Sequence, residues 1–222
     1  MMENFNDLNT CGLDLKKVTE YAIEKEIAKD YTGYYLDEYV IGMSSGTSGN
    51  KGIYITPRSM TKRLPFVFLA RGGIPLKMLP FRILFLLRVF SQGFADINAP
   101  MINLTYRSTM TNPEELIEII NREKINIIMA PPSMLRILMG LKDKIKVKLK
   151  LIVSYAEVLE MEDKEKISKI FDVDIHEIYQ ASEGQMASTC KHGNLHINED
   201  LVFVELYDNH QSSKSCPTSN SL

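Results

Sequence analysis

Tryptophan is absent from this 222-residue chain, and cysteine is scarce, with Cys11, Cys190 and Cys216 widely separated. Three distant cysteines form no disulfide framework of the kind that small secreted scaffolds use. The formal charge is −2 at pH 7, and basic residues are not interleaved with aromatic ones. Non-specific nucleic-acid binding needs a basic excess, so we do not expect nucleic acid as a partner.

A long hydrophobic run is also missing. The most apolar stretch, residues 79–94, reads LPFRILFLLRVFSQGF, and its uninterrupted apolar part lies between Arg82 and Arg88. A spanning helix needs about 20 mostly apolar residues. We therefore expect no membrane span and interpret the stretch as a buried helix packed on a sheet, with interfacial membrane attachment as the alternative.

The first residues, MMENFNDLNTCG, lack the basic and apolar regions of a signal peptide. Together with the scarcity of cysteine, this leads us to expect a cytoplasmic protein. Apolar residues make up 45% of the chain and charged residues 24%, which is typical of a globular protein with one sizeable core.

Apolar periodicity alternates between the helical and the extended type along the chain. We expect helices at 15–30, from 57 onward, and at 113–122, 133–141 and 161–171, and strands at 39–43, 53–56, 125–130, 149–154 and 174–179. This alternation predicts an α/β fold in which a mostly parallel sheet is covered by helices on both faces. Ligands bind such sheets at the carboxyl ends of the strands.

Local signals support three of these helices. In the first, Val18, Ala22, Ile23 and Ile27 are expected to share one apolar face. The pair Asn112-Pro113 is typical of a helix N-cap and first turn, and Ser133 is the expected N-cap of the helix that follows it.

The most informative motif is SSGTSGNKG at 44–52, between the strand-like segments YVIGM and IYIT. Its glycines permit positive φ and close backbone approach, and successive N–H groups can form an anion nest. Hydroxyl groups and one ammonium add donors and positive charge. We interpret the motif as a polyphosphate-binding loop, with a plain polar hairpin loop as the alternative. The expected ligands are Ser44, Ser45, Gly46, Thr47, Ser48, Gly49, Lys51 and Gly52.

The loop is not a Walker P-loop, because that motif leads into a helix, whereas Gly52 leads into the β-branched segment IYIT. It resembles the signature loop of the adenylate-forming superfamily, which activates carboxylates with ATP and reads roughly [ST]SGTTGxPKG. The proline and one residue of spacing between Gly49 and Lys51 are missing here. The shortened form is similar to the branch of phenylacetate-CoA ligase relatives and CapK-like capsular polysaccharide proteins.

Three further segments resemble family motifs in the same order. Residues 127–138, IIMAPPSMLRIL, resemble the acyl-pocket segment, and Ala156-Glu157 in LKLIVSYAEVLE resembles a Gly-Ala-Glu-Pro-like turn beside the adenine. Residues 178–184, IYQASEG, resemble the Y-G-x-[ST]-E element, with Gln180 in place of the usual glycine.

The resemblance implies a role for each matching residue. Tyr179 would stack on adenine, Ser182 would contact phosphate, and Glu183 would help hold Mg²⁺, which prefers hard oxygen ligands. Lys51 and Glu183 would then be the catalytic residues, with ATP and Mg²⁺ as cofactors. The implied reaction converts a small-molecule carboxylate into an acyl-adenylate, with CoA or another compound as acceptor. Taken alone, Glu183 could equally be a solvated loop carboxylate.

Cys190, His192 and His196 have spacings that zinc ligands can have. A four-ligand site would need one more ligand, and no C-x₂-C pattern is present. We favour a hairpin instead, in which residues 192–194 turn and LHIN forms the second strand.

Members of the resembled family are longer than this chain, and their ribose-binding Asp and C-terminal catalytic Lys are not recognisable here. We expect residues 1–207 to form a partial adenylation domain, truncated at both ends. Residues 208–222, DNHQSSKSCPTSNSL, have the composition of a disordered tail. Two alternatives are an inactive remnant that binds nucleotide or a partner through exposed sheet edges, and an NTPase with an unrelated loop.

Overall fold

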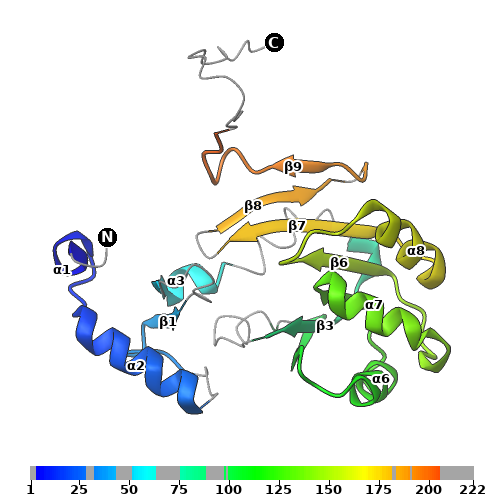
Figure 1. Ribbon diagram of the computed structural model, residues 1–222, viewed down its shortest axis with the longest axis horizontal. Coiled ribbons are helices and arrows are strands. Elements are labelled where there is room, and N and C mark those ends of the chain that lie inside the picture. Colours follow the sequence, from blue (N-terminus) through cyan, green and yellow to red (C-terminus); the bar gives the residue numbers. More distant parts are fainter. Residues whose placement is uncertain are drawn as a thin grey trace, which may run out of the picture.

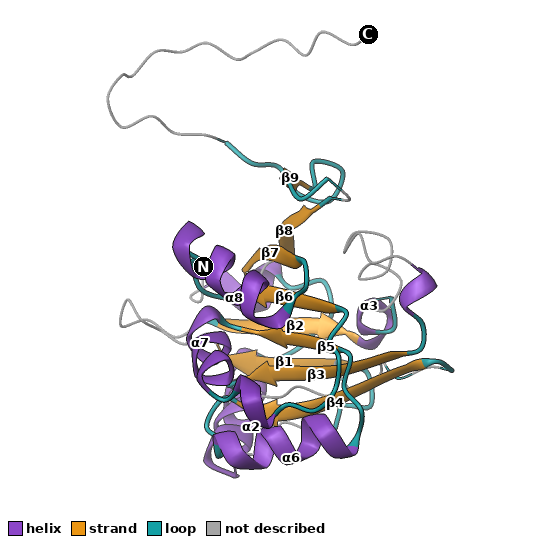
Figure 2. Cartoon of the chain, turned by 90° about the vertical axis from the view of Figure 1, so that its right-hand side faces the viewer, coloured by secondary structure: helices purple, strands orange, loops and turns teal. Residues whose placement is uncertain are grey.

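A seven-stranded sheet is the centre of the computed structural model, which describes residues 4–28, 33–43, 52–63, 76–88, 98, 100–181, 184–190 and 192–205. The strand order is β4-β3-β5-β6-β7-β8-β9; Figure 1 shows β6 to β9 in succession, and Figure 2 labels all seven strands. The strands are β3 (Phe81–Leu87), β4 (Ile102–Ser108), β5 (Ile127–Ala130), β6 (Leu151–Tyr155), β7 (Ile175–Ala181), β8 (Gly184–Thr189) and β9 (Leu195–Ile197). The first five in this order pair in parallel, and β8 and β9 pair antiparallel. The predicted α/β class with a mostly parallel sheet is confirmed.

Three helices pack on one face of this sheet: α6 (Pro113–Arg122), α7 (Pro132–Gly140) and α8 (Met161–Phe171) (Figure 2). Their apolar residues form one cluster with alternate residues of the strands, including Ile128 and Ile152, which have no exposed surface. The cap of α6 is as predicted, because the Asn112 side chain accepts a hydrogen bond from the Glu114 N–H at 2.9 Å and Pro113 occupies the first turn. These helices confirm their predicted positions to within one or two residues.

The other strand residues point to the opposite face and form a second cluster. Its buried members are Phe81, Ile83, Phe85, Ile127, Met129, Leu151, Val153, Tyr155 and Ile178. Among the described helical segments, the short 3₁₀ turn η2 (Leu76–Met78) contributes to this cluster through Met78. Both faces of the central strands are therefore buried in apolar side chains.

The segment expected to be a buried helix within 79–94 is a strand instead. Within β3, Ile83 and Phe85 belong to the second cluster, whereas Leu84 and Leu86 belong to the helix-covered one. A parallel strand that is buried on both faces has a continuous apolar run without alternation, which periodicity alone does not distinguish from a buried helix. Within the described ranges, none of the helices combines the length and apolarity that crossing a membrane requires.

Strand β4 has no counterpart in the sequence prediction. It extends the sheet beyond β3, and its sequence INLTYRS alternates apolar with polar residues. Ile102, Leu104 and Tyr106 pack against the second cluster. The period of two was thus present in the sequence, as expected of a strand that is covered on one face.

The N-terminal part comprises α1 (Phe5–Leu8), α2 (Leu15–Ala28), the antiparallel pair β1 (Tyr39–Met43) and β2 (Ile53–Pro57), and α3 (Arg58–Thr61). It has a cluster of its own, to which α2 contributes Val18 and Ala22. The expectation that Ile23 and Ile27 share that buried face is wrong, because they are 42% and 78% exposed. Ile23 lies one residue, or about 100° of helix rotation, past buried Ala22, and Ile27 lies five residues, or about 140°, past it.

Position 42 in β1 needs a glycine, because the Tyr54 ring opposite it leaves no room for a Cβ. Gly42 pairs with Tyr54 of β2, and a Cβ at Gly42 would overlap Cζ and Oη of that tyrosine. Gly140 in α7 is the matched comparison, since a Cβ there meets nothing within 4 Å.

We expect Gly42→Ala to lower the free energy of unfolding by about 1–3 kcal/mol, because the Tyr54 ring must move. Gly140→Ala should leave stability unchanged or raise it by up to about 1 kcal/mol through helix propensity. Chemical denaturation of both variants, and of Gly42→Ala in a Tyr54→Ala background, measures the effect. An equal loss in that background would show that the ring is not the cause.

Candidate functional site

The candidate residues after β6 and within β7 lie side by side at the carboxyl edge of the sheet. Tyr155, the last residue of β6, pairs with Ile178 of β7 in the parallel register. Ala156 directly follows β6, and Tyr179 is the next residue of β7, which continues to Ala181. Since carboxyl ends of parallel strands share one edge, two motifs far apart in sequence meet here.

The turn after β6 begins with an unusual backbone conformation. Ala156 is exposed and has φ of +68°, in the left-handed region that non-glycine residues rarely adopt. This conformation turns the chain away from the strand direction immediately after Tyr155. Glu157, the next residue, is thereby directed to the helix of the preceding crossover.

Glu157 holds the first turn of α7. Its carboxylate accepts hydrogen bonds from the Ser133 N–H at 3.0 Å and from the Ser133 hydroxyl at 2.8 Å. The prediction that Ser133 is the N-cap is wrong, because α7 begins at Pro132 after Pro131 and neither proline supplies a capping side chain. The Glu157 carboxylate, which lies between β6 and α8, accepts from the Ser133 N–H instead. The dipole of α7 favours a negative charge at this position.

Tyr179 presents its ring to solvent, with 63% of the residue exposed. It pairs with Ala187 of β8, and the register shifts between Tyr179 and Gln180. A bulge of this kind changes the direction of side chains at the end of a strand. An exposed ring at this edge offers a stacking surface for a planar ligand.

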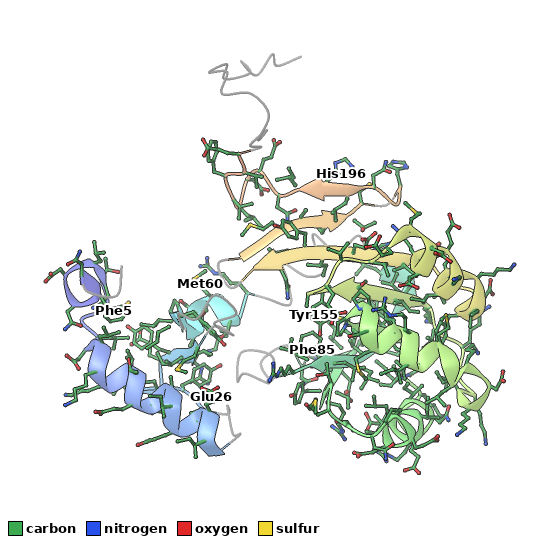
Figure 3. All side chains as sticks on the ribbon, viewed as in Figure 1. Phe5, Glu26, Met60, Phe85, Tyr155 and His196 are labelled. Atoms are coloured by element: carbon green, nitrogen blue, oxygen red, sulfur yellow. The ribbon has the colours of Figure 1, made fainter. Side chains whose placement is uncertain are left out.

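Phe85 and Tyr155 lie beneath this edge among the residues of the second cluster (Figure 3), and Tyr106 packs against the same cluster. The rings of Phe85 and Tyr155 are stacked, with centroids 5.5 Å apart and an interplanar angle of 26°. The Tyr155 hydroxyl donates to the carbonyl of Leu86, and the Tyr106 hydroxyl donates to the carbonyl of Leu87 at 3.2 Å. Burial raises the pKa of the Tyr155 hydroxyl far above its ordinary value, and the nearby Tyr106 adds to this. Sequence reasoning did not identify Tyr155 as a supporting residue, although it immediately precedes Ala156-Glu157.

The phosphate-loop residues Ser44, Ser45, Gly46, Thr47, Ser48, Gly49 and Lys51 lie outside the described residues. The described flanks confirm that the loop joins two strands, because Met43 pairs with Ile53 and half-buried Gly52 directly precedes β2. Ser182 and Glu183 also lie outside the described residues, between Ala181 and Gly184, which pair with each other. Of the candidate residues, the structure therefore places Gly52, Ala156, Glu157 and Tyr179.

The segment with Cys190, His192 and His196 is the predicted hairpin. Thr189 pairs with Leu195, and Gly193 turns the chain with φ of +83°. The His192 backbone N–H donates to the Cys190 sulfur at 3.4 Å, which lowers the pKa of that thiol. In the part of the chain that the structure describes, no three Cys, His, Asp or Glu side chains gather as a metal site would require.

Two cavities of about 520 and 420 Å³ open at the other end of β3 and β4, where Arg82 and Asn103 line both. Neither cavity is lined by a candidate residue. They lie at the amino ends of the strands, so they do not correspond to the ligand position that the fold favours.

We expect Tyr155→Phe to lower the free energy of unfolding at neutral pH by about 1–3 kcal/mol, because the Leu86 carbonyl loses a buried donor. The same substitution should also change how the free energy of unfolding depends on pH. The raised pKa means that the unfolded tyrosine ionises near its ordinary value of about 10 while the folded one stays protonated. Stability from this group is complete below pH 10 and is lost as the pH rises further. Urea denaturation across this range should show a shallower alkaline decline for the variant, and an equally steep decline would contradict the assignment.

Glu157→Ala is expected to destabilise the protein by about 0.5–2 kcal/mol, the usual effect of removing a helix N-terminal acceptor. Glu160→Ala is the matched control, because Glu160 is exposed at the start of α8 and its side chain makes no capping bond. Thermal denaturation of both variants compares them. Equal losses would show that the Ser133 contacts contribute nothing specific.

Known proteins resemble this chain in their solved structures but not in their sequences. No protein-family model matches the chain, and no curated sequence matches it. Solved structures do: the amide bond synthetase McbA from Marinactinospora thermotolerans aligns over 69% of this chain and 32% of its own, with 13% identity and a TM-score of 0.54. A 2-hydroxyisobutyryl-CoA ligase aligns over 69% and 36%, with 12% identity and a TM-score of 0.54. An acyl-CoA synthetase from Brucella canis aligns over 70% and 30%, with 17% identity and a TM-score of 0.51.

The chain thus spans about a third of the length of these neighbours. At such low identities the likeness shows the fold. The sheet and its flanking helices share the fold of part of these synthetase and ligase structures.

Proposed function

We propose that this chain binds ATP at the carboxyl edge of its parallel sheet and takes part in carboxylate activation by acyl-adenylate formation. One observation carries the proposal. The turn at Ala156-Glu157, directly after β6, lies beside the exposed Tyr179 of the paired strand β7, and these two separate motifs meet in a fold shared with adenylate-forming ligases.

The adenine would stack on Tyr179, whose exposed ring has the area and orientation to solvent that stacking needs. Stacking of a base on an aromatic side chain contributes about 1–3 kcal/mol. The backbone turn at Ala156 would border the base, and the buried Tyr155 beneath it keeps that turn in place. In this proposal the described residues Ala156 and Tyr179 would form the base-binding half of the site.

The phosphate half of the proposal depends on sequence. Lys51 and the hydroxyls of Ser44, Ser45, Thr47 and Ser48 would offset phosphate charge, with Gly46, Gly49 and Gly52 allowing close backbone approach. Ser182 would donate to a phosphate oxygen. Glu183 comes two residues after Ala181 in the sequence, and a single carboxylate shared with substrate phosphates is a donor set that suits Mg²⁺. When bound there, the ion would neutralise charge on the pyrophosphate.

In the proposed reaction a carboxylate oxygen attacks the α-phosphorus of ATP. The bond from this phosphorus to the bridging oxygen breaks, and pyrophosphate leaves with the electron pair. The protein contributes positioning and electrostatic stabilisation rather than a covalent intermediate. Of the similar structures, one is named as a complex with 2-HIB-AMP and CoA. CoA or another compound would accept the acyl group here.

The wider setting is proposed from the shortened phosphate loop alone. Its likeness to the CapK branch suggests a carboxylate in surface or capsular polysaccharide metabolism. The scarcity of cysteine and the ATP requirement suit the cytoplasm.

A second candidate function is nucleotide binding without turnover. It is favoured by the sequence itself, in which the ribose-binding Asp and the catalytic Lys of the resembled family are not recognisable. Both candidates need the same ATP site, so only turnover separates them.

We expect Tyr179→Ala to weaken binding of Mg-ATP about tenfold, because the stacking surface is lost. Tyr179→Phe should keep most of the affinity, since the ring remains. Isothermal titration calorimetry compares these variants with the unmodified chain and with Lys51→Ala, which should lose more. Wild-type protein that does not bind Mg-ATP would overturn the proposal.

Exchange of radiolabelled pyrophosphate into ATP, measured with a panel of carboxylates, then separates the two candidates. Carboxylate-dependent exchange supports activation. Binding of Mg-ATP without exchange supports the non-catalytic candidate.

A further inference from the structure

The two cavities at the amino ends of β3 and β4 share one arginine, Arg82, and its neighbour Asn103. These two residues are register partners in parallel strands, so their side chains point to the same face of the sheet. It is the helix-covered face, because Leu84, two residues further along β3, belongs to that cluster. The proposed nucleotide site is at the opposite ends of the strands, so a ligand bound here would be a separate one.

The end of helix α6 fixes the direction of the Arg82 guanidinium. The Ile125 N–H bonds to the Ile120 carbonyl at 3.0 Å, and Lys124 between them has a left-handed φ of +52°. This is the geometry of a Schellman helix end. It presents the Lys124 carbonyl to Arg82, whose Nε–H donates to it at 2.6 Å. The guanidinium is therefore anchored along one edge.

The other edge of the guanidinium has donors to spare. An arginine has five N–H donors, and within the described ranges only the Nε–H of Arg82 has an acceptor. The exposed Asn103 accepts a long hydrogen bond from the Thr105 hydroxyl at 3.4 Å, while its side-chain NH₂ donates to no described group. Two side chains that line both cavities thus offer unused N–H donors.

One carboxylate lines the smaller cavity, and its charge is already balanced. Glu123 accepts hydrogen bonds from the Thr105 hydroxyl at 2.6 Å and from the Arg122 guanidinium at 3.0 Å. Arg122 and Glu123 therefore form an ion pair. Among the described carboxylates, none lies within ion-pair distance of Arg82. The unbalanced charge at the cavities is positive, which favours an anionic ligand.

The larger cavity places apolar side chains beside this charge. Pro80, Met101 and Ile102 line it, and Met101 is 59% exposed. Its volume of about 520 Å³ is within the range of about 300–1,000 Å³ that is usual for small-molecule sites. An apolar group held next to an anionic head would cover the Met101 side chain.

We propose that this end of the sheet binds a small organic anion, with a carboxylate or phosphate head at Arg82 and Asn103 and an apolar body in the larger cavity. The free edge of a guanidinium can donate to two oxygens of such a head at once. Because the Lys124 carbonyl already holds the guanidinium, little side-chain freedom is lost on binding.

Titration of the ¹⁵N-labelled full chain with hexanoate, hexyl phosphate and hexanol tests the site by NMR, since these probes share an alkyl chain and differ in the head. At least one of the two anions should shift the backbone amides of residues 101–105 and 123–125 saturably, and hexanol should not. The anion that binds more tightly identifies the head group. The proposal is overturned if neither anion shifts these amides, if hexanol shifts them equally, or if the shifts are confined to residues 156–158 and 179–181.

Arg82→Gln should weaken binding of that anion about tenfold or more, because charge-assisted hydrogen bonds are lost. Arg88→Gln is the matched control, since Arg88 is exposed directly after the opposite end of β3. Asn103→Asp leaves the Lys124 contact in place and should also weaken binding, because it puts a negative charge beside the head. Circular dichroism establishes that the variants are folded. Affinity that Arg82→Gln and Asp at position 103 leave at the level of the Arg88→Gln control would contradict the proposal.

Titration with Mg-ATP separates this site from the nucleotide site. Arg82→Gln should bind Mg-ATP as the unmodified chain does, because the two sites are at opposite ends of the strands. Loss of Mg-ATP binding in this variant would contradict the proposal of a separate site. Binding of the anion by a chain that does not bind Mg-ATP would support this proposal and overturn only the proposed function.

Discussion

Burial of both faces of the parallel strands is the constraint on which the rest of the structure depends. Strands β3, β5 and β6 direct alternate side chains into two apolar clusters, one beneath the helices and one on the opposite face. Apolar burial contributes about 25 cal/mol per Å² and fixes the register, because a slip of one residue would exchange the two faces. The strand ends therefore have fixed positions relative to one another. These positions determine where the candidate site residues at the carboxyl edge lie.

The alternation of strands and helices, the α6 cap and the β8–β9 hairpin were predictable because each has a local cause in the sequence. The apolar run that became β3 was not, since burial on both faces removes the period that distinguishes a strand. The exposed Ile23 and Ile27 show a related limit: a helix can carry more apolar residues than its neighbours cover. What covers a surface depends on tertiary contacts, which a single segment does not encode.

The candidate site also has a part that the sequence predicted and a part that depends on tertiary contacts. Ala156, Glu157 and Tyr179 were proposed from motifs, and the register places Ala156, directly after β6, beside Tyr179 of β7. The structure adds that Glu157 is engaged with Ser133, so its carboxylate has a role in the scaffold as well as a position in the motif. That contact joins two successive crossovers. It lies between residues 24 positions apart and leaves no local pattern from which it could have been predicted.

The Tyr155 hydroxyl bond has a mechanical consequence. It joins β6 to the carbonyl of Leu86 in β3, 69 residues earlier, and β5 lies between these two strands. Sliding of β6 or β3 along its axis would break this bond as well as the ladder bonds to β5. The three strands therefore resist shear as one unit, and the height of the Ala156 turn above the sheet cannot change independently of β3. A ligand that binds at this edge meets a surface whose shape is set before it arrives.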